Sequence, residues 1–465
     1  MQINLTGNIF FDAGYYLFYH ILNKPFEDKE FSPEEIQKVI DWMIQETDRW
    51  LSYLDSNTKQ FKSRFIPYLA NHDPLSHAQK AKLDKSEKIN TFKEILLKLL
   101  THCEVSSNNT CSICGQFETI KIREIDKESY GLTRVELPLS NFGVNFYPGW
   151  VRGIQTCGIC ALKAYATIFA TLNSSGKVIL LNSFSSEIMK IWIETTRDES
   201  KLSKYNIFDE KGPITLPISN RLNAIYSLLK PLVDEGLKKK LPPYVYRNIE
   251  FIYYSNFVNG PEIQFFPISH HIFMFFFKLK QNALLLKWNQ FVYQFYTSNK
   301  IQYDESKQKL IITEKKDNRE AQEEEYQNNY NILIEKLLNG KPLFKEFVKD
   351  KKLRIEYKII ELYILEVLKV EKERLDLIKQ IADLIAKNIR QGDMKLFDVE
   401  DATEYFKFQR FLVMAAKKHV QNMGNPLFTV DDYVNNLIGD YKTVHNIMLI
   451  RLYELLADFI TKQTN

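Results

Sequence analysis

Cysteine is scarce in this chain, and no segment stays apolar for long enough to cross a membrane. Five cysteines among 465 residues are too few for a disulfide scaffold. The most apolar run, residues 272–279, is broken by Lys278 and is far shorter than the ~20 residues that span a bilayer. The first residues also lack the basic region and apolar core of a secretory signal. We therefore expect a cytoplasmic protein that makes no membrane contact.

Recognisable catalytic motifs are also missing. A phosphate-binding loop would need glycine where Thr171 stands, and serine or threonine where Val178 stands. The pair His270-His271 has no further metal ligand at helical spacing, which favours a role at the start of a helix. No paired carboxylates or nucleophile with a matching base can be identified. We therefore expect a binding or assembly protein and not an enzyme.

Composition places the chain among ordinary globular proteins. Hydrophobic residues make up 45% and charged residues 26% of the sequence, and the length allows two or three domains. The formal net charge is only +4, so the charge as a whole does not require a nucleic acid partner. Local basic faces remain compatible with one.

The most informative feature is a pair of CxxC motifs, Cys111-Ser-Ile-Cys114 and Cys157-Gly-Ile-Cys160. A CxxC turn directs both sulfurs towards one point, and two such turns together form the tetrahedral sulfur shell that zinc prefers. Gly115 can adopt the left-handed backbone conformation that closes such a turn. Because all four ligands are thiolates, no open coordination position is indicated. The sequence therefore predicts a structural Zn²⁺ site without catalytic chemistry.

Three other interpretations of the cysteines stay open at this level. A thioredoxin-like redox pair would explain one CxxC motif but not two. Structural disulfides are disfavoured in a chain with an odd number of cysteines and no secretory signal. Chance pairing is the third. A helix is expected directly after Cys160, which would place the second turn at a helix N-terminus, where the dipole favours thiolate.

The expected fold is α+β, with a mixed N-terminal domain over 1–316 and an all-α helical bundle over 317–465. The four-cysteine zinc site is embedded in the first domain, within about 105–165. Near the N-terminus, Asp12 is expected to cap a helix, and Gly14 in its first turn indicates that another segment packs closely there. The later periodicity predicts the following elements: strands flanking Asn259-Gly260, a long aromatic helix over 270–296, and a hairpin over 301–313.

A loop rich in asparagine, glycine and aromatic residues, 141–149, precedes the second CxxC motif. Asparagine offers a donor and an acceptor, and glycine lets the backbone approach a duplex groove. The candidate nucleic-acid contacts are Asn141, Asn145, Arg152 and Lys163. The alternative is that this loop folds over the zinc site and contacts no partner.

The N-terminal string Thr6-Gly7-Asn8-x-Phe10-x-Asp12-Ala13-Gly14, followed by the two CxxC motifs, resembles a known family. It is similar to the CXXC–CXXC large subunit of type I (I-A/I-B) CRISPR Cascade interference complexes. The resemblance covers residues 1–20 and 105–165. One departure is Ile9, which stands where proline is expected after the asparagine.

The resemblance implies a non-catalytic large subunit of an RNA-guided surveillance complex. Such a subunit recognises the protospacer-adjacent motif in double-stranded target DNA, stabilises the opened strands and helps recruit a helicase–nuclease. Its partners would be the crRNA-bound Cascade backbone and the small subunits. Only the four cysteines transfer by position as metal ligands. Two alternatives remain: a zinc-stabilised scaffold or regulator that binds proteins without nucleic acid, and a redox enzyme.

Overall fold

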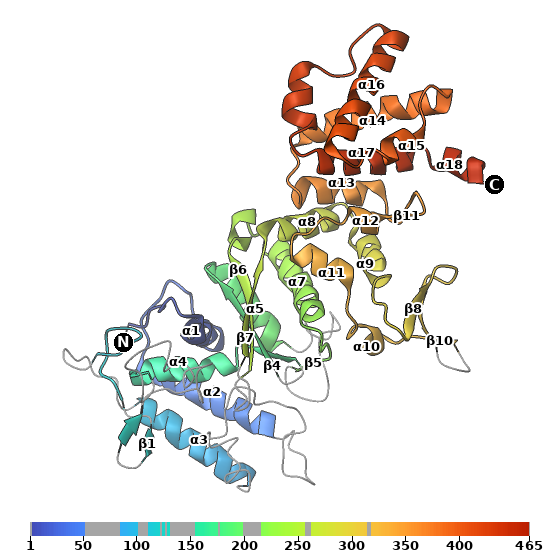
Figure 1. The fold of residues 1–465 in the computed structure, drawn as a ribbon. Helices are drawn as coiled ribbons and strands as arrows, with labels where there is room; N and C mark the ends of the chain where they lie inside the picture. The colour runs from blue at the N-terminus through green and yellow to red at the C-terminus, as the bar shows by residue number, and fades with distance from the viewer. Residues whose placement is uncertain are drawn as a thin grey trace. The chain divides into compact units, whose positions relative to one another are not determined.

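The computed structural model divides the chain into two compact units (Figure 1). Unit 1 comprises Met1–His270 and Gln322–Asn329, and unit 2 comprises His271–Ala321 and Tyr330–Asn465. The structure describes residues 2–51, 84–100, 110–120, 123–125, 128–130, 154–174, 177–198, 215–255, 262–313 and 318–464. In these ranges no helix is both long and apolar enough to cross a membrane.

Unit 1 combines helices with one larger sheet. Its helices are α1 (Ile9–Leu22), α2 (Pro33–Leu51), α3 (Lys85–Leu100), α4 (Gly158–Ile168), α5 (Ser186–Arg197), α7 (Arg221–Lys238), the 3₁₀ helix η2 (Pro243–Tyr246) and α10 (Glu323–Tyr326). Its strands are β1 (Arg123–Ile125), β2 (Glu128–Tyr130), β3 (Leu172–Ser174), β4 (Lys177–Ser183), β5 (Thr215–Leu216), β6 (Ile249–Ser255) and β7 (Glu262–Ile268).

The five-stranded sheet of unit 1 has the order β5-β3-β4-β6-β7. Neighbouring strands are antiparallel except for the parallel pair β3 and β5. The hairpin predicted around Asn259-Gly260 is confirmed by the pairing of β6 with β7, although the turn itself lies outside the described residues. Helix α5 packs against the central strand β4, and the indole of Trp192 on α5 donates to Ala170 O at 2.8 Å.

Unit 2 consists mainly of helices, with two small sheets. Its helices are α8 (His270–Gln281), α9 (Leu285–Tyr293), α11 (Ile332–Leu338), α12 (Phe344–Phe347), α13 (Tyr357–Glu366), α14 (Lys372–Gln391), α15 (Leu396–Glu400), α16 (Tyr405–Met423), the π-helix η3 (Asp432–Leu437), α17 (Tyr441–Leu455) and α18 (Ala457–Thr464). Its strands are β8 (Ile301–Asp304), β9 (Lys309–Thr313), β10 (Asn318–Glu320), β11 (Val348–Lys349) and β12 (Lys352–Leu353).

The expected fold class is confirmed in its coarse form, since the chain is a mixture of helices and sheet with a four-cysteine cluster. The all-α expectation for 317–465 needs correction at two places. Strand β10 pairs with β9, and β11 forms a two-stranded hairpin with β12. That hairpin turns at Asp350 and Lys351, which have φ of +49° and +62°. Neither residue is a glycine, so the sequence offers no obvious turn signal there.

The domain boundary expected between residues 316 and 317 differs from the boundaries of the two compact units. Because β10 extends the β8–β9 hairpin, residues 318–320 belong to the same sheet as 301–313. Residues 322–329 then return to unit 1. The side-chain amide of Asn223 in α7 donates to Gln327 O at 2.6 Å and to Asn329 O at 2.7 Å, which fastens this segment to the first unit.

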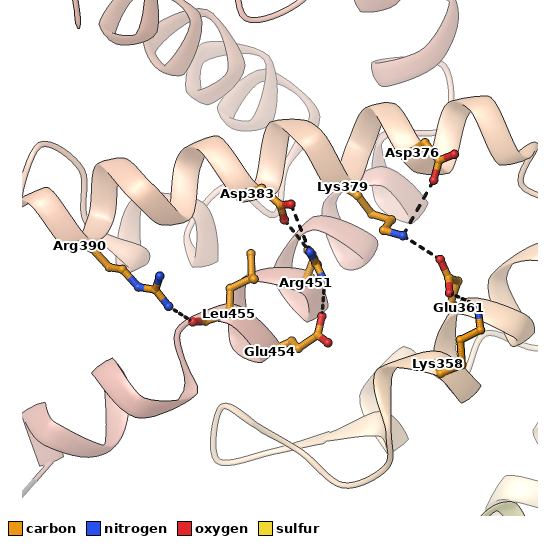
Figure 2. A network of polar contacts seen from close by, with 9 residues as sticks. All are labelled: Lys358, Glu361, Asp376, Lys379, Asp383, Arg390, Arg451, Glu454 and Leu455. Atoms are coloured by element: carbon orange, nitrogen blue, oxygen red, sulfur yellow. Dashed lines mark hydrogen bonds and ion pairs between the residues drawn. The ribbon is translucent and has the colours of Figure 1, made fainter. Parts of the chain in front are cut away.

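Charged contacts join α13, α14 and α17 in unit 2, as Figure 2 shows. Arg451 on α17 forms a two-pronged pair with Asp383 on α14, with Nε–Oδ1 at 2.8 Å and Nη2–Oδ2 at 3.1 Å. Its third nitrogen bonds Glu454 at 2.6 Å, and the guanidinium lies 5.2 Å from the centre of the Tyr357 ring. These acidic partners raise the pKa of Arg451, the bond to Asp383 contributing most. One arginine therefore connects three helices.

Replacing Arg451 by lysine is expected to destabilise unit 2 by about 1 kcal/mol, because lysine keeps the charge but loses the fork and the ring contact. Chemical denaturation of the full chain measures this. Lys358→Gln is the control: Lys358 is exposed and pairs with Glu361 at 2.7 Å, so its loss should change the free energy of unfolding by less than about 0.5 kcal/mol. Equal effects of both variants would contradict a special role for Arg451.

The buried His445 on α17 gives unit 2 a dependence on pH. Its Nε2 lies 2.8 Å from Val399 O, and burial lowers the pKa of the imidazole. Between that lowered pKa and about 6.5, the unfolded chain binds more protons, so the free energy of unfolding falls as the pH drops. His445→Gln keeps an N–H donor and removes the titration. Its loss of stability from about pH 7.5 to about pH 5.5 should be smaller than that of the wild type, and an identical loss would refute this assignment.

Candidate metal centre

The first CxxC motif forms a tight turn closed by backbone hydrogen bonds. The amide of Gly115 donates to Cys111 O at 2.9 Å, and that of Cys111 donates to Phe117 O at 2.8 Å. Gly115 has φ of +65°, the left-handed conformation predicted for it. The amide of Ile113 points to the sulfur of Cys111 at 3.4 Å. The backbone therefore directs this pair of thiols to one side of the turn.

The second CxxC motif begins α4, as the sequence predicts. Cys157 is the N-cap of α4, and its sulfur accepts from the amide of Cys160 at 3.4 Å. The two motifs are joined through the backbone, because the amide of Ser112 donates to Gln155 O at 3.0 Å. Thiolates at this position benefit from the free amides and the dipole of the helix N-terminus.

All four sulfurs converge. The Sγ atoms of Cys111, Cys114, Cys157 and Cys160 lie within 4.8 Å of one another, and none is in a disulfide. The Cys114 and Cys157 sulfurs are 3.8 Å apart. Three of the cysteines are buried and Cys114 is half-buried. Convergence excludes the chance interpretation, and a single redox pair does not require four sulfurs. The cluster is compatible with a metal site.

The four close thiols affect one another's pKa values. Hydrogen bonds from Cys111, then from Cys157 and Cys160, lower the pKa of the Cys114 thiol far below its usual range. Hydrogen bonds with Cys111, Cys114 and Cys157, together with burial, raise the pKa of the Cys160 thiol. Deprotonated, all four sulfurs can serve as thiolate ligands of one metal ion.

The N-terminal motif of the resemblance builds a compact loop and helix start. Helix α1 begins at Ile9 and is capped by Asn8, whose side chain accepts from the amide of Phe10. Asp12 is therefore not the cap that the sequence predicted. Its carboxylate instead accepts from Thr6 N, Thr6 Oγ1 and Gly7 N, each at 2.8 Å. Burial raises the pKa of Asp12, although these hydrogen bonds and the nearby charge of Lys163 act in the opposite direction.

Helix α1 packs directly on α4, the helix that begins at the second CxxC motif. The amide of Gly14 donates to Thr167 Oγ1 at 2.9 Å, and a Cβ on Gly14 would lie 2.0 Å from Lys163 O. The close approach predicted at Gly14 is confirmed. The N-terminal motif and the cysteine motif are thus parts of one packed structure.

The candidate nucleic-acid contacts have different outcomes. Asn141, Asn145 and Arg152 lie outside the described residues. Lys163 is only 1% exposed, and its ammonium donates to Asn4 O at 2.9 Å and lies 5.4 Å from the centre of the Tyr15 ring. It therefore fastens the N-terminal loop to α4 and is not available as a surface cation in this structure.

Two features of the packed structure formed by the N-terminal motif and α4 were not predicted from the sequence. One is the hydrogen bond of Thr167 with Gly14, and the other is the role of Asp12 in binding Thr6 and Gly7. The role of Asp12 could have been inferred from its position five and six residues after Gly7 and Thr6. At this spacing a carboxylate can accept hydrogen bonds from the amides of the preceding loop. Thr167 bonds Gly14 from far along the chain, so no local pattern indicates it. No family model, no curated protein and no solved structure matches this chain.

Proposed function

We propose that the four-cysteine cluster binds one Zn²⁺ ion as a structural element. A Zn–S bond of about 2.3 Å in a tetrahedron places the sulfurs about 3.8 Å apart. This agrees with the 3.8 Å between Cys114 and Cys157 and with the 4.8 Å limit for the whole set. The four ligands would close the coordination shell, so the metal would tie the first turn to α4 and would leave no position for a substrate.

We propose further that the chain is a non-catalytic large subunit of a type I RNA-guided interference complex. The observation that carries this proposal is the packing of α1 on α4. The two segments that resemble the CXXC–CXXC large subunit, 1–20 and 105–165, are far apart in sequence but meet where Gly14 lies against the backbone of Lys163. Just beyond the second segment, Thr167 accepts a hydrogen bond from the amide of Gly14. Residues that fold together in this way are expected to serve one function.

In this proposal, the chain recognises the protospacer-adjacent motif of target DNA, stabilises the opened strands and helps recruit the helicase–nuclease. Asn141, Asn145 and Arg152 stay the proposed DNA contacts. Lys163 acts indirectly, because it holds the N-terminal loop against α4.

An exposed apolar face on α16 favours partner binding by unit 2. Phe406, Val413 and Val420 recur at seven-residue spacing and are 79%, 59% and 46% exposed. The opposite face of this helix packs inward through residues such as Phe408, which is fully buried. Large exposed apolar residues that recur along one side of a helix favour an interaction surface. This face also suits the second candidate function, a metal-stabilised scaffold that binds proteins without nucleic acid.

Co-purification separates the two functions. The tagged full chain is isolated from its native host, bound RNA is sequenced and bound zinc is quantified. We expect uniform repeat-derived RNAs together with backbone subunits and one zinc per chain. Protein partners and zinc without such RNA would reject the interference complex and leave the scaffold.

A further inference from the structure

A polar pocket of about 710 Å³ lies in unit 2, away from the cysteines and the N-terminal motif. It is formed by α9 and the residues after it, by the β8–β9 hairpin and by the β11–β12 hairpin with the residues that follow. The volume suits a small ligand or one residue of a polymer. Its lining is rich in cations and aromatic rings.

Positive charges are gathered on one hairpin. Lys349 and Lys352 are directly opposite each other in the β11–β12 pair, and Arg354 follows two positions after Lys352. Like charges opposite each other across strands destabilise a hairpin. The positive charges of Lys349, Lys352 and Arg354 therefore repel one another at this hairpin. An anionic ligand bound there would reduce this repulsion.

Carboxylates neutralise only part of this charge. Among the pocket residues Lys287 pairs with Glu356, and Lys349 pairs with Glu305. Asp350 in the turn is the remaining lining carboxylate. In the described part of the chain, neither Lys352 nor Arg354 forms an ion pair. These two cations are available to a ligand.

Arg354 is held in place for such a contact. Its guanidinium lies 4.5 Å from the centre of the Phe295 ring and donates to Gln294 Oε1 at 2.9 Å, while its amide donates to Phe347 O at 2.9 Å. Burial lowers the pKa of this half-buried guanidinium, while the nearby Glu305, Tyr303 and Glu346 act in the opposite direction. A guanidinium held against an aromatic ring can form two parallel hydrogen bonds to phosphate oxygens. Because the side chain is already ordered, it loses little conformational entropy on binding.

Two tyrosines provide a surface for a flat ring. Tyr293 and Tyr303 both line the pocket, are half-buried and meet edge to face with their centres 6.3 Å apart. The hydroxyl of Tyr293 accepts from the amide of Leu310 at 3.0 Å, which fixes this ring against β9. Aromatic faces beside cations are the usual means of binding a base together with its phosphate.

We propose that this pocket binds a nucleotide, with its phosphate on Lys352 and Arg354 and its base against Tyr293 or Tyr303. The ligand is either a free mononucleotide or one nucleotide of a single strand, since both present the same chemistry. This site is independent of the metal centre and of the proposed DNA contacts in unit 1.

Calorimetric titration of the full chain with adenosine monophosphate, inorganic phosphate, adenosine and a thymidine decamer tests the proposal. The monophosphate should bind more tightly than phosphate, and adenosine more weakly than the monophosphate. Lys352→Gln and Arg354→Gln should each weaken binding of the monophosphate about 10-fold or more. Competition between the decamer and the monophosphate identifies the natural ligand. Tighter binding of the decamer indicates a single strand, and tighter binding of the monophosphate indicates a free nucleotide.

Lys345→Gln is the matched control, because Lys345 is exposed on α12 and does not line the pocket. It should bind the monophosphate as the wild type does. Without ligand, Lys352→Gln should be at least as stable as the wild type, since it removes a repulsion, whereas a purely structural Lys352 would give a less stable variant. Wild-type affinity in Lys352→Gln and Arg354→Gln, or no binding of the monophosphate at millimolar concentration, would overturn the proposal.

Discussion

Cys111→Ser is expected to release the metal and to unfold much of unit 1. A serine hydroxyl does not replace a thiolate in a four-sulfur shell, and the binding free energy of a structural metal is folding free energy. Removing one ligand from a buried site should therefore lower the stability of unit 1 by about 5 kcal/mol or more, which approaches the total for a typical domain. Chemical denaturation and elemental analysis of the full chain measure both effects.

Cys103→Ser is the control for this variant, because Cys103 is the one cysteine outside the CxxC motifs. It should keep one metal ion per chain. A strong chelator should bring the wild type towards the stability of Cys111→Ser and leave that variant unchanged. A Cys111→Ser protein that retains one equivalent of zinc would contradict the assignment of Cys111 as a ligand.

Gly14→Ala is expected to produce the second large effect. The added Cβ would lie 2.0 Å from Lys163 O and 3.0 Å from the amide nitrogen of Thr167, which are backbone atoms of α4. Helix α1 would have to move away from α4, with a loss of about 3 kcal/mol. Because Cys157 caps α4 and Cys160 lies in its first turn, this movement should also weaken metal binding, which competition with a chelator measures.

Gly439→Ala is the matched control. A Cβ there meets no atom within 4 Å, and the residue does not have a positive φ. The exchange should leave stability unchanged or raise it by about 0.5 kcal/mol, through the lower entropy of the unfolded chain. Similar losses of stability in Gly14→Ala and Gly439→Ala would show that the close contact between α1 and α4 at Gly14 is not the cause of the effect.

Local chemistry made the candidate site predictable. The CxxC turns, the left-handed Gly115 and the helix N-terminus at the second motif follow from residue type and spacing, and the structure confirms them. The helix begins at Gly158, inside the motif, and not after Cys160. The close contact at Gly14 was predictable because glycine is costly in a helix unless something needs the space. Its partner, Thr167 on α4, was not, since a contact between distant segments has no periodic pattern.

Turns made by ordinary residues account for the main errors in the fold. The long aromatic helix predicted over 270–296 is two helices, α8 and α9, separated where Ala283 takes φ of +57°. The β11–β12 hairpin turns through Asp350 and Lys351 in the same way. In both places exposed residues other than glycine take a left-handed conformation, so residue type alone did not indicate the turn.

X-ray absorption at the zinc edge of the purified full chain tests the metal assignment most directly. We predict four sulfur neighbours at about 2.3 Å and no nitrogen or oxygen ligand, with one zinc per chain. A shell containing nitrogen or oxygen, or a metal-free chain whose CxxC motifs form disulfides, would contradict the proposed four-thiolate zinc site.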